Sequence, residues 1–460
     1  MAAPGSPDGV RGASARALDT IKIDLGQVSG TPEGGGVTAF LGVPFAAPPV
    51  GDLRWRPPQP AKPWTGVRNA NRFGTSCMQV EAGSRLPWTE EFMTQGPIGE
   101  DCLFLNVWTP AVRANAKLPV MFWIYGGGFN EGSGQVAVYD GTELAKKGVI
   151  VVSVNYRVGV LGFLAHPELS AESEHHVSGN YGILDQIAAL QFVHRNIAAF
   201  GGDPDRVTIF GQSAGALSVA ALMKSPLAKG LFVRAIAQSG PGLLRTNNAR
   251  GATPTPADRE AAGAKYGDAR GAKTIAELRA IPAADFYPAA RTGIPAPPNG
   301  PFADGWVIPQ TDPSDQVPLM VGFVADDLGI SGANVPADQK PAARARARAA
   351  VDAWAADQRH ASRTIYTYYF DRVLPWPAHP EFGAFHSSDV PYVFNTLDKL
   401  DRPWTSVDRT VADQVSSYWS NFAKTGDPNG PGLPKWPLYD PDAHVTMELG
   451  ERAGSMPIAR

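Results

Sequence analysis

The chain has 460 residues, 43% of them hydrophobic, which is enough apolar material for a large buried core. Its 41 basic and 44 acidic residues give a net charge of -3, so no positive surplus is available to neutralise a nucleic acid backbone. No apolar run reaches the roughly 18 residues that a membrane-spanning helix needs. We therefore expect a small-molecule partner, with no nucleic acid and no membrane span.

Residues 1–18 (MAAPGSPDGVRGASARAL) lack the apolar stretch of about 7 to 15 residues found in a signal peptide. We interpret them as a flexible tail, of the kind left when such a peptide has been removed. Downstream, Cys77 and Cys102 have neither the C-x-x-C pairing nor the neighbouring histidines of a zinc site. Their spacing alone leaves open a disulfide or two free buried thiols.

The first regular elements are two segments that alternate apolar and polar residues. They are IKIDLGQVSG (21–30) and VTAFLGVPFA (37–46), and they are joined through Gly34–Gly36. Alternation with a period of two is typical of antiparallel strands that bury one face. The sequence therefore predicts an N-terminal antiparallel meander.

From Lys117 to Phe210, short apolar runs alternate with helical stretches, which indicates a mostly parallel sheet covered by helices. Apolar residues recur with helical spacing between Asn180 and Phe200, and Gly201–Asp205 then interrupts the helix. The last strand runs directly into GQSAG and a second helix, ALSVAALM. The strands expected here are 118–125, 149–156 and 206–210.

Beyond Ser239 the pattern weakens, and Asn247–Gly305 is rich in Ala, Pro and Gly. We expect short helices and loops there that cap the sheet. Strand character returns at 317–324 and 364–370, and an amphipathic helix follows at 411–423. Because strands lie on both sides of the Pro-rich stretch, we expect 19–460 to form a single domain.

The pentapeptide Gly211-Gln212-Ser213-Ala214-Gly215 matches G-x-S-x-G, the turn that lifts a nucleophilic serine above a sheet. The motif alone is weak evidence, because a serine before a helix also serves as an ordinary N-cap. Its position between an apolar strand and a helix favours the nucleophile.

A serine hydroxyl needs a base within hydrogen-bond reach and a carboxylate to orient that base. Among the eight histidines, four follow the motif with room for an acid between: His360, His379, His386 and His444. His386 lies in GAFHSSDVPYVF, where small residues leave the loop free to place an imidazole over the sheet. His379 stands in a Pro-flanked loop and His444 in a polar segment, so His386 is the preferred base.

In open α/β sheets, catalytic groups gather beyond the carboxyl ends of the strands. Asp326 and Asp327 follow the strand at 317–324, and on this argument either one could be the acid. Gly126–Gly128 follow the strand at 118–125, where glycine N–H groups can bind an oxyanion without steric hindrance. The N–H of Ala214, after the serine, supplies a further donor.

Taken together, these segments resemble the type-B carboxylesterases, the family that includes the cholinesterases and many bacterial esterases. The resemblance runs from about Gly26 to Asp440. It is carried, in order, by FLGVPFAAPPVGDLRWRPPQP, EDCLFLNVWTP, WIYGGGF, NYRVGVLGF, GNYGILDQIAALQFVHRNIAAFGGDP and VTIFGQSAG. It implies the α/β-hydrolase fold and ester hydrolysis through an acyl-enzyme, with no metal or cofactor, in a monomer or weak oligomer.

The resemblance also assigns roles to residues. The family usually has DEG where this chain has Asp326-Asp327-Leu328, which puts Asp327 on the acid. A family disulfide falls on Cys77 and Cys102, and it implies a secreted or periplasmic protein because such bonds persist outside the reducing cytosol. The assigned set is the nucleophile Ser213, the base His386, the acid Asp327, and the oxyanion donors Gly127, Gly128 and Ala214.

Two departures from the family bear on the substrate. Gln212 stands where many members carry Glu, which removes a negative charge beside the nucleophile and favours neutral or anionic esters over cationic ones. The segment between Asp327 and His386 is shorter than usual, which implies a reduced cap and a cleft open to bulky esters. The alternatives are amide or thioester cleavage by the same residues, and a non-catalytic binding module on the same scaffold.

Overall fold

A computed structural model of the protein describes residues 18–80, 83–240, 254–287, 294, 297, 299–311, 317–327, 335–360 and 364–457. Of the predicted N-terminal tail, residues 1–17 lie outside the described residues. Parts of 247–305 lie outside them too, as do 328–334 and 361–363 between Asp327 and His386.

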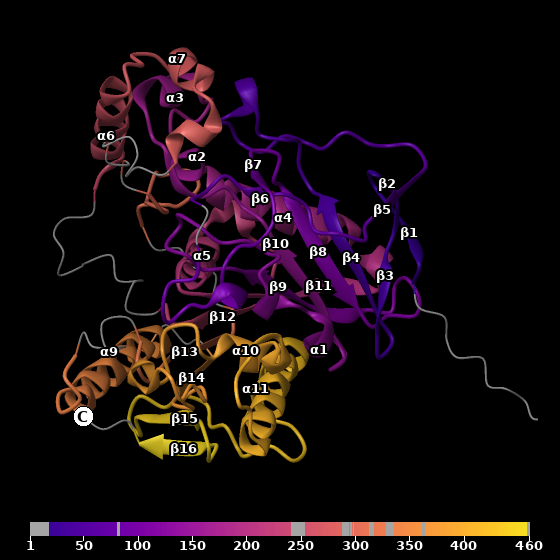
Figure 1. The fold of residues 1–460 in the computed structure, drawn as a ribbon, viewed down its shortest axis with the longest axis vertical. Helices are drawn as coiled ribbons and strands as arrows, with labels where there is room; N and C mark the ends of the chain where they lie inside the picture. The colour runs from indigo at the N-terminus through magenta and orange to yellow at the C-terminus, as the bar shows by residue number, and fades with distance from the viewer. Residues whose placement is uncertain are drawn as a thin grey trace, which may run out of the picture.

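The described residues contain one large mixed sheet (Figure 1), as the resemblance implies. Its strands pair in parallel from β10 through β15 and antiparallel at both ends. In spatial order they are β16 (Gly454–Pro457), β15 (Val445–Leu449), β14 (Ile365–Phe370), β13 (Leu319–Val324), β12 (Arg234–Gln238), β11 (Gly202–Gln212), β9 (Leu118–Ile124), β10 (Ile150–Val154), β8 (Phe104–Thr109), β4 (Val37–Pro44) and β3 (Thr31–Gly34).

The N-terminal meander is present but is divided between two sheets. β3 and β4 form the hairpin predicted around the glycines, and Gly34, Gly35 and Gly36 all adopt positive φ, which glycine does at little cost. The segment 21–30 was predicted as one strand of this meander. It is itself a hairpin, β1 (Thr20–Ile23) and β2 (Gly26–Ser29), in a separate sheet with β5 (Val67–Asn69).

Helices cover both faces of the large sheet. On β9, side chains alternate between faces, so Val120 and Trp123 point in opposite directions. Val120 lies beside Ile197, which follows α4 (Tyr181–Asn196), whereas Trp123 contacts Phe394, which ends α10 (Val390–Val393). α10 packs on α11 (Ser406–Thr425), and α4 packs on α5 (Ala214–Lys224).

Most predicted elements occur close to their expected bounds. The strands expected at 118–125, 149–156, 206–210, 317–324 and 364–370 correspond to β9, β10, β11, β13 and β14, and the helices to α4, α5 and α11. Gly201, with a φ of 90°, ends the short 3-10 turn after α4. The described part of 247–305 contains the helices α6 (Pro256–Ala269) and α7 (Ile275–Ala280), which Figure 1 shows grouped with α3 (Pro167–Glu172).

Sequence patterns did not predict β12 or the helix α9 (Lys340–His360). β12 lies between β11 and β13 and so joins the two parts of the sheet that flank the Pro-rich stretch.

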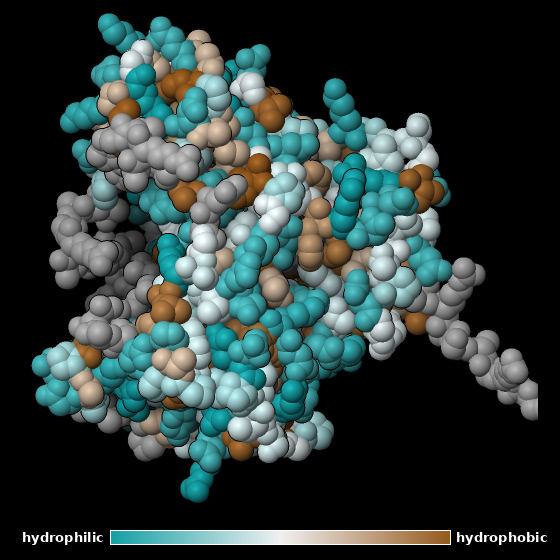
Figure 2. Space-filling model, viewed as in Figure 1, coloured by the Kyte–Doolittle hydropathy of each residue, from teal (hydrophilic) through white to brown (hydrophobic). Residues whose placement is uncertain are grey.

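The apolar residues of the central strands form the core. All residues of β10, β13 and β14 are buried, as are six of the seven in β9. On the face in Figure 2, apolar side chains of the described residues lie as isolated spots among hydrophilic ones. No helix of the described residues is both long and apolar enough to cross a membrane.

Candidate active site

Ser213 occupies the sharp turn between β11 and α5. Its φ of 58° and ψ of -122° are unfavourable for a residue with a side chain, and such strain typically costs about 1–3 kcal/mol. A Cβ on Gly211 would lie 2.6 Å from Gly215, and one on Gly215 would lie 2.0 Å from the Ile124 carbonyl oxygen. The two glycines of the motif are therefore required because the backbones of the turn and of β9 approach so closely.

The glycine loop after β9 is held by its own carbonyl groups. Gly127 O accepts hydrogen bonds from the backbone N–H groups of Asn130 (3.0 Å) and Glu131 (3.2 Å). Because a peptide unit is planar, fixing this carbonyl also fixes the direction of the Gly128 N–H. Gly127 and Gly128 adopt φ values of 105° and 62°. The N–H of Ala214, at the start of α5, has no intrahelical acceptor. It is therefore available, beside those of Gly127 and Gly128, to donate a hydrogen bond to an oxyanion.

His386 is paired with Asp327. The imidazole Nδ1 and the carboxylate Oδ1 form a hydrogen bond, and both side chains are largely buried. An ionised carboxylate can only accept, so Nδ1 carries the proton and Nε2 presents its lone pair. This tautomer is the one that a general base needs.

The side chain of Asp326 hydrogen-bonds to Arg344 and to the Ala384 N–H rather than to His386, although the sequence argument treated it as equal to Asp327. Its side chain is fully buried and forms an ion pair with Arg344 of α9. The two neighbouring carboxylates therefore occupy different environments.

The Nε2 atom of His386 faces the strand-to-helix turn that carries Ser213. Its hydrogen-bond partner among the described residues is the side-chain amide nitrogen of Gln212, at 3.0 Å, rather than Ser213 Oγ. The amide N–H donates to the Nε2 lone pair. Catalytic hydrogen bonds often tighten only when substrate is bound, and Ser213 lines the same cavity as this imidazole.

Two of the other candidate histidines lie elsewhere. The imidazole of His379 pairs with Glu381, and that of His444 pairs with Asp352 at 2.8 Å. His360 is the last residue of α9, and its side chain is outside the described residues.

A cavity of about 560 Å³ opens above Ser213 and His386. Much of its wall belongs to the loop closed by the disulfide between Cys77 and Cys102, which is present in the structure. Within this loop, Trp88 donates a hydrogen bond from Nε1 to the His386 carbonyl oxygen at 3.1 Å. The cavity-lining residues of the loop are Gln79, Val80, Gly83, Arg85, Trp88, Phe92, Met93 and Thr94.

A third carboxylate lies near the site and was not predicted from the sequence. Asp389 is buried, and its Oδ2 accepts hydrogen bonds from Gln238 (3.0 Å) and Tyr368 (3.1 Å). Oδ1 has no partner among the described residues. Burial, opposed by these hydrogen bonds, raises the pKa of Asp389 to about 6. The only signal in the sequence was an acidic residue at the start of the apolar run VPYVF.

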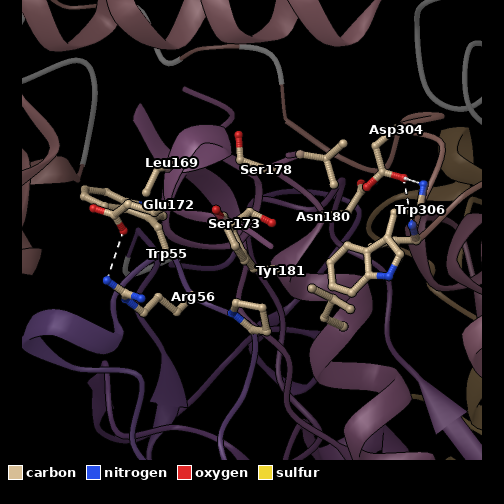
Figure 3. A pocket seen from close by; sticks show the side chains of 15 residues that line it. Trp55, Arg56, Leu169, Glu172, Ser173, Ser178, Asn180, Tyr181, Asp304 and Trp306 are labelled. Atoms are coloured by element: carbon tan, nitrogen blue, oxygen red, sulfur yellow. Dashed lines mark hydrogen bonds and ion pairs between the residues drawn. The ribbon is translucent and has the colours of Figure 1, made fainter. Parts of the chain in front are cut away.

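A second cavity, shown in Figure 3, is much smaller, at about 40 Å³. It is bordered by the ion pair of Arg56 with Glu172 and by Asp304, whose Oδ1 accepts from the Trp306 N–H. None of the predicted site residues lines it, and it has room for only a few waters. The described residues contain no group of three or more His, Cys, Asp or Glu side chains that could hold a metal ion.

Comparisons with known proteins agree on one family. The family model described as "Carboxylesterase family" matches residues 18–358 and 342–457. The fumonisin B1 esterase of Sphingopyxis macrogoltabida is 36% identical over 93% of this chain and 86% of its own length. The para-nitrobenzyl esterase of Bacillus subtilis (strain 168) is 35% identical over 93% of this chain and 94% of its own length.

Two further comparisons extend this result. The human cocaine esterase is 33% identical over 88% of this chain and 82% of its own length. A solved structure titled PNB esterase superposes with a TM-score of 0.78 at 30% identity, covering 96% of this chain and 97% of that one. Likeness of both sequence and structure therefore extends over nearly the whole chain.

Proposed function

Because the chain belongs to the carboxylesterase family and is an ester hydrolase, we propose that it cleaves its substrate with Ser213, His386 and Asp327. One observation carries this proposal. A serine on a strained strand-to-helix turn lines the same cavity as an imidazole whose Nδ1 is hydrogen-bonded to a carboxylate. For this role His386 Nε2 must exchange its hydrogen bond with the Gln212 amide for one with Ser213 Oγ in the same cavity.

In the proposed mechanism, Ser213 Oγ attacks the ester carbonyl carbon while His386 Nε2 takes the hydroxyl proton. The carbonyl oxygen becomes an oxyanion, which the N–H groups of Gly127, Gly128 and Ala214 stabilise. As the tetrahedral intermediate collapses, His386 returns the proton to the leaving alcohol and an acyl-enzyme forms. A water, deprotonated by His386, then attacks the acyl-enzyme, and the carboxylic acid is released as Ser213 regains its proton. Asp327 keeps the imidazole in the required tautomer throughout.

We propose neutral or anionic, bulky esters as the substrate class. The ionic side chains of the described cavity wall, apart from His386, are Arg85 and Glu131, and these form an ion pair. Gln212 places a neutral amide where many family members have a carboxylate, so among the described lining residues no unpaired negative charge next to Ser213 attracts a cation. The names of the relatives refer to esters as different as fumonisin B1 and cocaine, which supports a wide cleft.

Three further expectations are proposals of the same kind. We propose that 19–460 form a single domain, which is supported by one sheet of the described residues running from β3 to β16. A second proposal is that the cap of this domain is reduced. We also propose that the enzyme works outside the reducing cytosol, which the disulfide supports.

The test is hydrolysis of p-nitrophenyl esters of increasing acyl length and of bulky neutral and carboxylate-bearing esters. Wild type should turn over, and Ser213→Ala should lose activity against all of them while keeping its thermal unfolding midpoint. Retained activity in Ser213→Ala would remove Ser213 from the mechanism. Matched amides and thioesters, run in parallel, decide whether the same residues also cleave those bonds.

A further inference from the structure

The carboxylate of Asp326 is fully buried beside the site and is paired with an arginine. Its exposed fraction is 0%, whereas its partner Arg344 is 33% exposed. Arg344 Nη2 lies 2.6 Å from Oδ1 and 2.8 Å from Oδ2, and Nε lies 3.1 Å from Oδ1. Such a fork on a carboxylate fixes direction as well as charge. A buried carboxylate needs this partner, because an uncompensated charge in the interior is strongly unfavourable.

Asp326 also joins the two chain segments that carry Asp327 and His386. Its N–H donates to Ala384 O at 2.9 Å, and its Oδ2 accepts from the Ala384 N–H at 3.0 Å. Asp326 and Phe385 form a parallel bridge. Asp327 and His386 are the next residues in the two segments, so the contacts of Asp326 determine where they lie relative to one another.

Gly383 shows how closely the two segments approach. Its φ is 61°, and a Cβ built on it would lie 2.0 Å from Asp326 Oδ2. Only glycine allows the loop to reach the carboxylate here. The loop that leads to His386 is therefore shaped around the Asp326 side chain.

α9 supplies the other half of this arrangement. Figure 1 shows it beside β13 and β14, and its contacts with β14 agree with that view. At the start of the helix, Lys340 Nζ donates to Glu381 O at 2.9 Å, which is a second contact with the loop before His386. Arg344 does not line the active-site cavity, so any effect on catalysis must act through Asp326.

We propose that Arg344 and Asp326 are positioning residues that hold His386 in register with Asp327, so that α9 supports the catalytic base. The proposal rests on the function proposed above. It assigns to α9 a role in the geometry of proton transfer, because small misplacements of a reacting group cost large factors in rate.

Because Asp326 is fully buried and Arg344 is partly exposed, we expect substitution of Arg344 to lower kcat more than substitution of Asp326. Arg344→Met leaves a fully buried carboxylate without its counterion, so the loop must move or Asp326 must take up a proton. We expect kcat to fall about tenfold to a hundredfold with KM little changed. Asp326→Asn leaves a partly exposed guanidinium, which water can solvate, and it keeps an oxygen for the Ala384 N–H. Its loss of kcat should be smaller.

The experiment measures kcat and KM for Arg344→Met, Arg344→Lys, Asp326→Asn and the double variant Asp326→Asn/Arg344→Met. Arg346→Met is the matched control, because Arg346 is exposed on the same helix. Arg344→Lys should recover part of the rate, and the double variant should be more active than Arg344→Met because it leaves no buried charge. The far-downfield proton resonance of His386 Nδ1, assigned by its loss in Asp327→Asn, should broaden or shift in Arg344→Met.

The outcomes separate this proposal from the function on which it rests. If wild type hydrolyses esters but Arg344→Met keeps both its kcat and the downfield resonance, the positioning role is wrong and the triad stands. Losses in the double variant equal to the product of the two single losses would also overturn it, because the residues would then act independently. If Ser213→Ala is as active as wild type, the proposed function fails first.

Discussion

The two halves of the proposed site are built in different ways. The nucleophile side, from β9 to α5, obtains its geometry from backbone conformations that glycines make possible within a few residues of the reacting groups. The acid–base side, from β13 to α10, depends on side chains distant in sequence, since Trp88 reaches His386 and Arg344 reaches Asp326. Local strain positions the serine, and tertiary contacts position the imidazole.

The sharpest test of the acid–base side compares two adjacent carboxylates. Asp327→Asn should lower kcat by about 10⁴-fold, because the amide favours the wrong imidazole tautomer. Asp326→Asn should cost far less. Both are measured by steady-state hydrolysis of one p-nitrophenyl ester. If Asp326→Asn were the more damaging change, the acid would be assigned to the wrong residue.

On the nucleophile side, the geometry of the oxyanion donors is disrupted most directly by a substitution of Gly127. A Cβ there would lie 2.2 Å from Glu131 O, at a φ of 105°. Gly127→Ala should therefore displace the oxyanion donors and lower kcat by about 10²–10³-fold. Gly230→Ala is the control, because Gly230 also has a positive φ but has open space around its Cβ position. Equal loss in both variants would point to general destabilisation rather than to the oxyanion donors.

A smaller loss of activity is expected from a change in the loop closed by the Cys77–Cys102 disulfide, which contacts the site through Trp88. Trp88→Phe keeps an aromatic ring but removes the Nε1–H, which donates to the His386 carbonyl oxygen at 3.1 Å and more weakly to Ser387 Oγ at 3.4 Å. Loss of one neutral hydrogen bond predicts about a threefold to tenfold fall in kcat/KM. Trp404→Phe removes a similar bond, from Nε1 to Leu400 O, outside the cavity lining, and should leave kcat/KM unchanged. An unchanged kcat/KM in Trp88→Phe would show that the disulfide loop lines the cavity but does not help to position His386.

The last prediction concerns stability rather than rate. The raised pKa of Asp389, about 6 in the folded protein against an ordinary 3.8, means that the folded state keeps a proton that the unfolded state has lost between these values. The stabilising contribution of this group is therefore complete below pH 4 and lost as pH rises through 6. The shift corresponds to about 3 kcal/mol.

Asp389→Asn cannot titrate, so it should remove this dependence. The free energy of unfolding in urea, measured for wild type and variant at pH 4 and pH 7, should show wild type losing about 2 kcal/mol more than Asp389→Asn over that range, because part of the effect is already lost at pH 4. Titrating groups that do not interact with Asp389 cancel in the difference between the two proteins. Equal pH dependence in both would contradict the assignment of the buried proton to Asp389.

The contrast between the two sides also explains what the sequence could predict. The turn at Ser213 and the glycine loop depend on residues close together in the sequence. Five consecutive residues between a strand and a helix were therefore sufficient to place Ser213 and its neighbours. The strands β9, β10, β11, β13 and β14 were likewise recognisable as apolar runs, whereas β12, with the short sequence RAIAQ, was not, and neither were β8, β15 and β16.

The acid–base side was only partly predictable, for a physical reason. Asp326 and Asp327 are chemically identical, and only the direction of the backbone after β13 decides which side chain turns inward to Arg344 and which faces His386. That direction depends on α9 and on the loop at Gly383, both distant contacts. The family resemblance, rather than any local pattern, separated the two aspartates.

The central claim is that Ser213 is a nucleophile activated by His386. Its most direct test is the intact mass of the protein after incubation with a fluorophosphonate probe, followed by peptide mapping. We expect one probe per chain, on Ser213, and much slower labelling in His386→Ala. A wild-type chain that stays unlabelled, or a Ser213→Ala variant that is labelled as fast as wild type, would contradict it.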